Sequence, residues 1–198
     1  MDCTNATVGG PVGSPATAGP APDPPDADGA AVAPVAGDGV PADLFRRALG
    51  RHPAGVVVIT AELSGEPVGI TATSFTSISL SPPLVGFCIA RTSSTWPRLR
   101  AAGDFAVNLL AEDQHDVATR FAARGVDRFA APTAWRRGPG AVPLLDGAAA
   151  HLLCERHDLR LLGDHWLVVG HVTRTCLPAE RPPLLYHRRT FGGFRPRE

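Results

Sequence analysis

The sequence predicts a mainly β protein, an antiparallel β-barrel with a few short helices, preceded by a disordered N-terminal tail. Six or seven segments of residues 43–198 carry strand patterns, and only a few carry helix patterns. Because the helices do not alternate strictly with the strands, a doubly wound parallel sheet is disfavoured. Residues 1–42 differ: Ala, Gly and Pro fill 25 positions, and no aromatic residue occurs. Such a segment cannot bury enough apolar surface to offset its ordering entropy, so we expect a disordered tail over 1–42 and one folded domain over 43–198.

The first half of the folded region predicts one helix and then a series of strands. Asp43 is a suitable N-cap for a helix that contains Leu44 and Leu49 and ends before Pro53. β-branched and apolar runs follow, with a turn over residues 64–67. The predicted strands are residues 55–61, 68–73, 75–80 and 84–90.

The second half predicts two helices and three strands. Hydroxyl residues followed by Pro97 indicate a capped helix start, and Gly103 ends that helix. Residues 112–123 form an amphipathic pattern with Phe121 on its apolar face. The stretch from there to about Val142 shows no periodicity, so we expect it to be irregular. The predicted strands are residues 104–110, 151–161 and 166–177, the last two joined by a hairpin turn at 162–165.

The charge pattern excludes several function classes. The chain has nineteen Arg, no Lys and nineteen acidic residues, and this formal charge of zero argues against a nucleic-acid partner. The absence of lysine excludes a Schiff-base lysine and a P-loop lysine. Residues 43–198 alone hold nineteen Arg and fourteen acidic residues, a net charge of about +5 that suits a small anionic ligand.

Neither a metal site nor a membrane segment is indicated. The four cysteines show no CxxC spacing, and Cys154 with His157 forms only a single C-x-x-H. We therefore expect no metal, and buried thiols at Cys88, Cys154 and Cys176. The start of the chain lacks the basic and apolar regions of a secretory signal, and no apolar run reaches the ~18 residues of a membrane span. These observations predict a cytoplasmic protein.

Hydroxyl side chains are concentrated in two segments. Seven Ser and Thr residues lie within residues 71–81, and four more at 92–95 follow directly on Arg91. An Arg beside hydroxyls at a helix start can hold a phosphate without lysine. The alternative is a solvated sheet edge with a simple helix cap; it is favoured for residues 71–81, and both interpretations stay open for residues 91–95. No G-x-G-x-x-G, P-loop, G-x-S-x-G or H-E-x-x-H motif occurs.

The order and spacing of several short motifs resemble the short-chain flavin reductases, the reductase components of two-component flavin-dependent monooxygenases. The resemblance covers about residues 44–194. The matching segments are RHPAGV at 51–56, TATSF at 71–75, SISLSPPL at 77–84, ART at 90–92, FAVNLL at 105–110, Phe121 with Phe129, GDH at 163–165 and PLLY at 183–186.

The resemblance implies a fold and an activity. The fold is an antiparallel, Greek-key split β-barrel that binds FMN, in a homodimer with the flavin near the subunit interface. The activity is hydride transfer from NADH or NADPH to FMN or FAD, with reduced flavin supplied to a separate monooxygenase. The family binds nicotinamide without a Rossmann motif, in agreement with the missing G-x-G-x-x-G. Two alternatives stay open: a flavin-binding module without reductase activity, and a split-barrel oxidase that acts directly on an organic substrate.

The resemblance also implies roles for individual residues. The positions expected around the flavin ring and ribityl chain are Pro53, Ala54, Gly55, Thr71, Ala72, Thr73, Ser74 and Phe75. The positions expected around the flavin phosphate are Ala90, Arg91, Thr92, Ser93 and Thr95. His165 matches a histidine beside the nicotinamide, and Tyr186 and Arg189 match a C-terminal segment that can approach the pyridine nucleotide. The sequence departs from the family pattern at Thr73 and Ser94.

Overall fold

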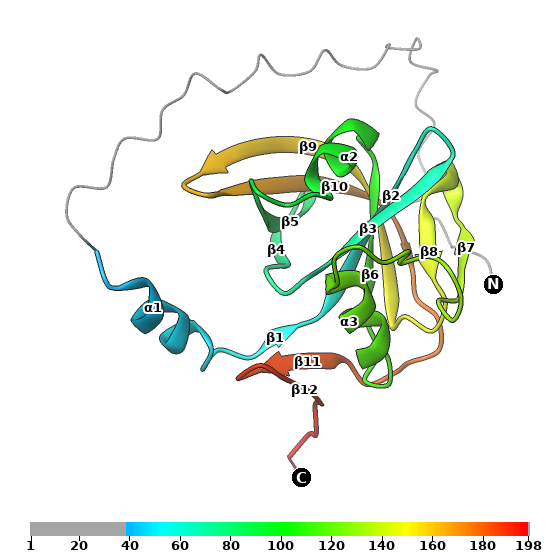
Figure 1. The fold of residues 1–198 in the computed structure, drawn as a ribbon. Helices are drawn as coiled ribbons and strands as arrows, with labels where there is room; N and C mark the ends of the chain where they lie inside the picture. Colours follow the sequence, from blue (N-terminus) through cyan, green and yellow to red (C-terminus); the bar gives the residue numbers. More distant parts are fainter. Residues whose placement is uncertain (1–38, 198) are drawn as a thin grey trace.

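A computed structural model describes residues 39–197, which form a curled seven-stranded sheet with a three-stranded sheet beside it (Figure 1). The helices are α1 (Ala42–Leu49), α2 (Trp96–Ala102) and α3 (His115–Ala122), with a 3-10 turn, η2, over Pro139–Ala141. The strands are β1 (Ala54–Gly55), β2 (Val57–Leu63), β3 (Glu66–Ala72), β4 (Thr76–Leu80), β5 (Pro83–Ala90), β6 (Phe105–Leu109), β7 (Trp135–Arg137), β8 (Pro143–Leu145), β9 (Ala150–Leu162), β10 (His165–Cys176), β11 (Leu184–His187) and β12 (Thr190–Gly193).

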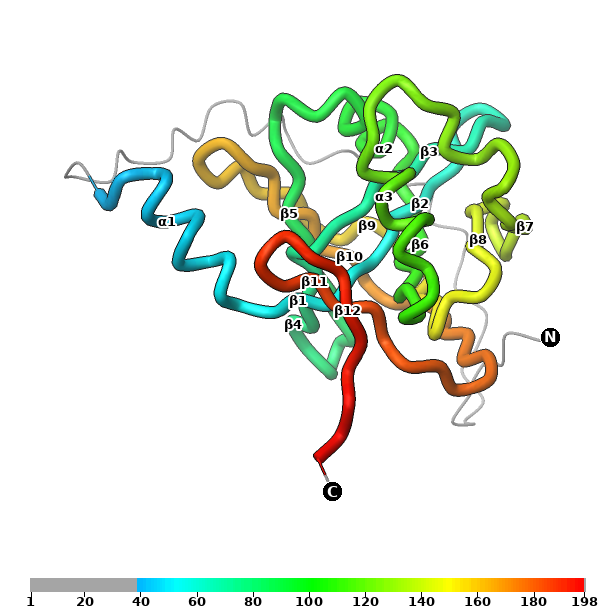
Figure 2. The backbone as a smooth tube through the Cα atoms, turned by 60° about the horizontal axis from the view of Figure 1, so that its bottom comes forward, coloured from blue at the N-terminus to red at the C-terminus, as the bar shows by residue number. Residues whose placement is uncertain are grey.

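The large sheet has the strand order β3-β2-β6-β9-β10-β5-β4, and every neighbouring pair is antiparallel. In the described part of the chain, β3 and β4 are its edges, so the barrel is split rather than closed. The small sheet has the order β1-β11-β12, and β7 pairs with β8. Figure 1 shows β1, β11 and β12 together below the large sheet, and in Figure 2 the same three strands lie in the middle of the view. The predicted mainly β, antiparallel fold with short helices is confirmed.

Strand β2 separates two apolar cores because it is buried on both faces. Val57 and Ile59 face the main core inside the curled sheet, where α2 contributes Trp96. Val58, and Val56 just before the strand, face a second core, which α3 covers with Phe121. A strand with two buried faces reads as a continuous apolar run rather than an alternating one, which explains the β-branched run that marks β2 in the sequence.

Two helix starts differ from the prediction. Helix α1 begins at Ala42 with Pro41 at the N-cap, so Asp43 lies in the first turn rather than at the cap. Helix α3 begins at His115 rather than near residue 112, because the Gln114 side chain accepts a hydrogen bond from the backbone N–H of Ala111 at 3.0 Å. That contact holds residues 111–114 in a turn. Gly103, with a φ of 79°, ends α2 as expected.

Two short hairpins were not predicted. Strands β7 and β8 lie in or directly after the stretch that the sequence indicates to be irregular, and β11 and β12 lie in the last fifteen residues. Each is three or four residues long, too short for an alternating pattern to be recognised. Their places depend on partners elsewhere in the chain; β11 pairs with β1, which lies about 130 residues earlier.

Cys154 is a buried free thiol as expected. Cys176 is buried but is disulfide-bonded rather than a free thiol. Cys88 is exposed, because its side chain points away from the main core. The predicted disordered tail lies almost wholly outside the described residues. Within residues 39–197, no helix is long and apolar enough to cross a bilayer.

Candidate functional site

A cavity of about 270 Å³ lies between β3, β5 and the loops that follow β5 and α3; we call it the inner cavity. It brings together six of the residues expected to bind the flavin. These are Thr71 and Ala72 at the end of β3, Ala90 at the end of β5, and Thr92, Ser93 and Thr95 in the loop before α2. Residues about twenty positions apart in the sequence thus face one space.

The hydroxyls of the β3 end have different partners. Thr71 donates its hydroxyl hydrogen to the Ala118 carbonyl at 2.6 Å, which fixes the side chain against α3. Ser74 accepts from the Cys88 N–H at 2.9 Å and donates to the Cys88 carbonyl at 3.0 Å. Ser74 therefore fastens the β3–β4 connection to β5. Thr73, Ser74 and Phe75 do not line the inner cavity, and Phe75 packs on the main core.

The loop over residues 91–95 divides its residues between two spaces. Thr92 and Ser93 line the inner cavity, while Arg91 faces a second space of about 450 Å³ that we call the rim cavity. The rim cavity is also lined by Gly163 and Asp164, and the backbone N–H of Arg91 donates to the Asp164 carbonyl at 3.0 Å. The expected hydroxyl cap is absent: Thr95, at the N-cap of α2, makes no side-chain cap bond.

His165 lines neither the inner cavity nor the rim cavity; it directly follows Asp164, which lines the rim cavity. It begins β10 directly opposite Ala90, the residue before Arg91. Its Nδ1 is 2.7 Å from Oδ1 of Asp164, and both side chains are exposed. This hydrogen bond, together with the imidazole's charge, holds the pKa of the Asp164 carboxyl below its usual value. His165 therefore lies close to the start of the 91–95 loop, and its ring is open to solvent.

The remaining predicted residues form a separate group on the small sheet. Ala54 pairs with Tyr186 across the β1–β11 ladder, and Pro53 and Gly55 flank Ala54. Arg189 lies in the β11–β12 turn with a φ of 68° and is exposed. None of these five residues lines the inner cavity. Within one chain, the structure therefore does not bring this group together with the residues of β3 and β5.

Two arginines that the sequence analysis did not select also line the inner cavity. Arg124 is exposed, and Arg128 is half-buried in the loop after α3. Arg128 donates through Nη1 to the Gly69 carbonyl at 2.6 Å and to Oγ1 of Thr95 at 2.8 Å. Its Nε and Nη2 donate to the Ala123 carbonyl at 3.2 and 2.6 Å.

Burial lowers the pKa of the Arg128 guanidinium, and among residues 39–197 no carboxylate forms a salt bridge with it. The stretch containing both arginines has no periodic pattern, and only the short Phe121 and Phe129 match pointed to it.

The inner cavity has the chemistry of an anion and ring site. Its lining contains hydroxyls, two arginines and no carboxylate. Ile70 adds a partly exposed apolar wall, whereas Phe87 and Ile89 line the cavity but are 2% and 4% exposed and pack on the main core. Arginine and hydroxyl donors match a phosphate, and an apolar wall matches a planar ring system. The residues therefore fit a flavin nucleotide. Within residues 39–197, no group of three or more metal-ligating side chains occurs.

Comparison with known proteins defines the class. Residues 49–195 match the model of the flavin reductase like domain. The chain is 38% identical over 151 residues to a flavin reductase of Pseudomonas putida, covering 76% of this chain and 88% of that protein. It is 42% identical over 167 residues to an NADH:FMN oxidoreductase of Rhodococcus erythropolis, covering 82% of this chain and 87% of that protein. The chain therefore belongs to the flavin reductase-like family.

Solved structures give the same result. The nitrilotriacetate monooxygenase component B homologue from Mycobacterium thermoresistibile superposes with a TM-score of 0.74 at 41% identity, covering 77% of this chain and 86% of that one. The NADH:FAD oxidoreductase SgcE6 of Streptomyces globisporus C-1027, in complex with NAD and FAD fragments, superposes with a TM-score of 0.72 at 40% identity. The match covers 77% of this chain and 92% of that one. The predicted family, enzyme class and cofactor classes, a flavin and a pyridine nucleotide, are confirmed.

Proposed function

We propose that this enzyme uses NADH or NADPH to reduce FMN or FAD, and that the reduced flavin leaves to serve a separate monooxygenase. The observation that carries this proposal is the inner cavity, where donors and apolar surfaces suited to a flavin nucleotide meet in a flavin reductase fold. Relatives named as reductase subunits of flavin-dependent monooxygenases support the choice of partner. Because NAD(P)H is a cytoplasmic reductant, the reaction favours a cytoplasmic location.

The protein's part in such a reaction is to bind and orient. The two cofactors supply the hydride donor and acceptor when bound, and no general base is required. Thr71 and Ala72 would lie against the ring side, while Thr92, Ser93 and the neighbouring arginines would hold the phosphate. His165, next to the rim-cavity residue Asp164, would orient the nicotinamide. As the family resemblance implies, residues 53–55 would lie near the flavin ring. Tyr186 and Arg189 would approach the pyridine nucleotide.

An activity grid tests the reaction. Purified protein is mixed with NADH or NADPH and with FMN or FAD, and the loss of nicotinamide absorbance is followed. We expect oxidation in at least one of the four combinations, with protein that purifies without bound flavin. Flavin binding without oxidation would favour the flavin-binding module, and a coloured protein that oxidises a third compound would favour the oxidase.

A dialysis experiment tests delivery by diffusion. The enzyme, NADH and flavin are placed on one side of a membrane under nitrogen, with ferricytochrome c on the other. We expect the cytochrome to be reduced, because reduced flavin crosses the membrane and transfers electrons without the enzyme. Oxidation of NADH with no reduction of the cytochrome beyond a flavin-free control would show that the reduced flavin stays bound.

We also propose that the enzyme is a homodimer. Helix α1 supports this proposal, because it contributes no buried residue to the described chain although it is amphipathic. Leu44, Phe45 and Leu49 are 49%, 53% and 54% exposed. Figure 1 shows α1 standing away from the sheets. An exposed apolar stripe of this kind is typical of a surface that a second copy covers.

A further inference from the structure

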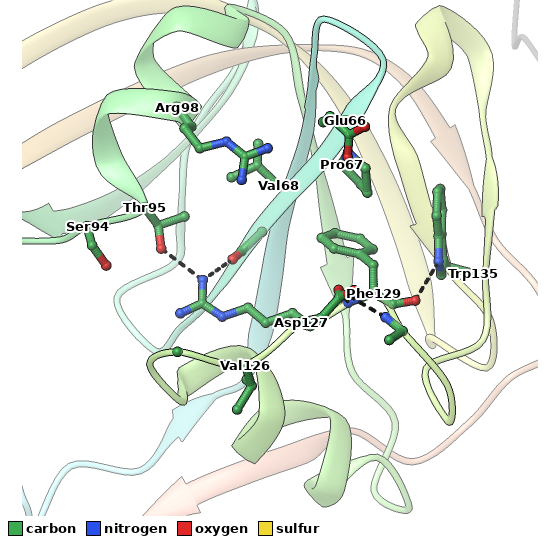
Figure 3. A pocket seen from close by; sticks show the side chains of 14 residues that line it. Glu66, Pro67, Val68, Ser94, Thr95, Arg98, Val126, Asp127, Phe129 and Trp135 are labelled. Carbon is green, nitrogen blue, oxygen red and sulfur yellow. Dashed lines mark hydrogen bonds between the residues drawn. The ribbon is translucent and has the colours of Figure 1, made fainter.

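A cavity of about 760 Å³ lies between the loop after β8, the start of β9 and the chain that follows β10; we call it the side cavity. It shares no lining residue with the inner cavity, the rim cavity or the cavity drawn in Figure 3, which adjoins the inner one. Strand β7 separates the last two spaces. Trp135 lines the cavity of Figure 3, whereas Arg136, the next residue, lines the side cavity, because successive side chains of a strand point to opposite faces.

One residue of the side cavity is a histidine whose protonation is fixed by a buried partner. His151 is 1% exposed, and its Nδ1 lies 2.9 Å from Oδ1 of Asn108. That oxygen has no hydrogen to donate and also accepts from the Leu145 N–H at 2.8 Å, so Nδ1 carries the imidazole hydrogen. Burial lowers the pKa of His151 to about 4, so the ring is neutral. Its other nitrogen, Nε2, therefore carries a lone pair and is a hydrogen-bond acceptor.

The lone pair of Nε2 has no partner in the described part of the chain. Within residues 39–197, the imidazole of His151 makes its hydrogen bond through Nδ1, to Asn108. Among the same residues, every fully buried side-chain nitrogen or oxygen has a hydrogen-bond partner. Nε2 is therefore not sealed in the core, and His151 lines the side cavity. A ligand in this cavity can satisfy Nε2 only with a hydroxyl or an N–H group.

The charged side chains around the side cavity are already paired. Nη1 of Arg136 lies 2.7 Å from Oδ1 of Asp146. Arg181 forms a salt bridge with Asp113 and donates to the Gly147 carbonyl at 2.9 Å. The charges of both arginines and of Asp146 are thus compensated within the protein. Because an ionised ligand would have to compete with these pairs, the cavity favours a neutral one.

Much of the remaining lining is apolar. Ala148 is buried at one side, and Leu177, Pro178 and Ala179 follow the end of β10 at the other. Leu177 is 78% exposed, so its side chain is open to a ligand. An apolar body placed here would remove this surface from water, which favours binding.

We propose that the side cavity binds a small neutral molecule with an apolar body and one hydroxyl or N–H donor, such as a phenol. Nε2 of His151 accepts the hydrogen bond from that donor, and Leu177 packs against the apolar body. This inference goes beyond the proposed function, because no residue assigned above to the flavin or to the pyridine nucleotide lines the side cavity. Binding at this site and flavin reduction can therefore be measured separately.

Three naphthalenes of similar size test the hydrogen bond. 2-Naphthol carries a hydroxyl donor, 2-methoxynaphthalene has no donor, and 2-naphthoate is an anion without a donor. Their dissociation constants for the full chain are measured at pH 7 by titration calorimetry, with excess FMN present to occupy the flavin site. We expect 2-naphthol to bind roughly two- to twelvefold more tightly than 2-methoxynaphthalene, the effect of one neutral hydrogen bond. Equal affinities for these two, or tighter binding of 2-naphthoate, would overturn the proposal.

Two substitutions locate the site. His151→Asn keeps a donor toward Asn108 but removes Nε2, so it should lower the affinity for 2-naphthol to that for 2-methoxynaphthalene. Leu177→Gln changes an exposed side chain and leaves the core intact, and it should weaken both ligands by roughly fivefold. Leu80→Gln on β4, where the side chain is 91% exposed, is the matched control and should bind both like the wild type. Unchanged binding in the His151 and Leu177 variants would place the naphthalenes elsewhere and show the proposal to be wrong.

Discussion

At the residue scale, a buried polar network beside the second core is centred on Asn108. Its amide nitrogen donates to the Val58 carbonyl at 3.0 Å and to Oγ1 of Thr60 at 2.9 Å. Its oxygen accepts from the Leu145 N–H at 2.8 Å and lies 2.9 Å from Nδ1 of His151. Since that oxygen accepts, Nδ1 of His151 is the donor. Burial lowers the pKa of His151 from 6.5 to about 4, so the imidazole is neutral in the folded protein.

This network predicts a loss of stability in acid. Between pH 6.5 and 4 the unfolded chain protonates His151 while the folded chain does not, so stability falls as the pH decreases through this window. From pH 7.5 to pH 5 the contribution of His151 to the free energy of unfolding should fall by about 2 kcal/mol. Urea unfolding at both pH values measures it. His151→Asn should lack this part of the decrease; an equal decrease in both proteins would contradict the assignment.

Arg91 and Arg124, which line different cavities, give a second residue-scale prediction. Arg91 faces the rim cavity, and Arg124 faces the inner cavity. Arg91→Ala should weaken FMN binding by about tenfold if its guanidinium contacts the phosphate, and riboflavin much less. Titration of both ligands measures this selectivity. Arg124→Ala is the comparison. If only that variant weakens FMN binding more than riboflavin binding, the phosphate lies in the inner cavity and does not contact Arg91.

At the element scale, the long β9–β10 hairpin depends on a close approach at Gly170. The ladder changes register between Val169 and Gly170. Phe105 lies on β6, which pairs with the other side of β9, and its ring lies against Gly170. A Cβ at residue 170 would lie 2.4 Å from Cζ of Phe105 and 3.0 Å from Cβ of Cys154. Both neighbours are buried, and Phe105 packs edge-on against Phe87 with ring centroids 5.5 Å apart. The ring therefore has little room to move.

We expect Gly170→Ala to destabilise the protein by ~1–3 kcal/mol, the usual cost of overpacking a core. The midpoint of urea unfolding measures the change. Gly192→Ala in β12 is the matched control, because a Cβ there has no atom within 4 Å. That substitution should alter stability by less than about 0.5 kcal/mol. Equal urea midpoints for the two variants would show that the β9–β10 hairpin moves to accommodate the added methyl group without a loss of stability.

At the scale of the whole molecule, the exposed face of α1 predicts assembly. The full chain should sediment as a dimer, because Leu44 and Phe45 would otherwise remain in contact with water. Replacing both by Glu should shift the sedimentation coefficient to that of a monomer. Arg47→Glu on the same helix changes charge while leaving those apolar side chains in place, and it should remain dimeric. A monomeric wild type would contradict the dimer.

The sequence by itself determined the mainly β class, the principal strands and the family. The apolar runs of β2, β5 and β10 and the turn at Gly163 express local backbone preferences that need no knowledge of distant contacts. Only the tertiary structure decided which predicted residues share a space. Arg128 becomes part of the site because it donates to Gly69, 59 residues away in the chain. Likewise, β1 is a strand because β11 pairs with it. Periodicity reports what one segment prefers, whereas cavities and short strands exist only where distant segments meet.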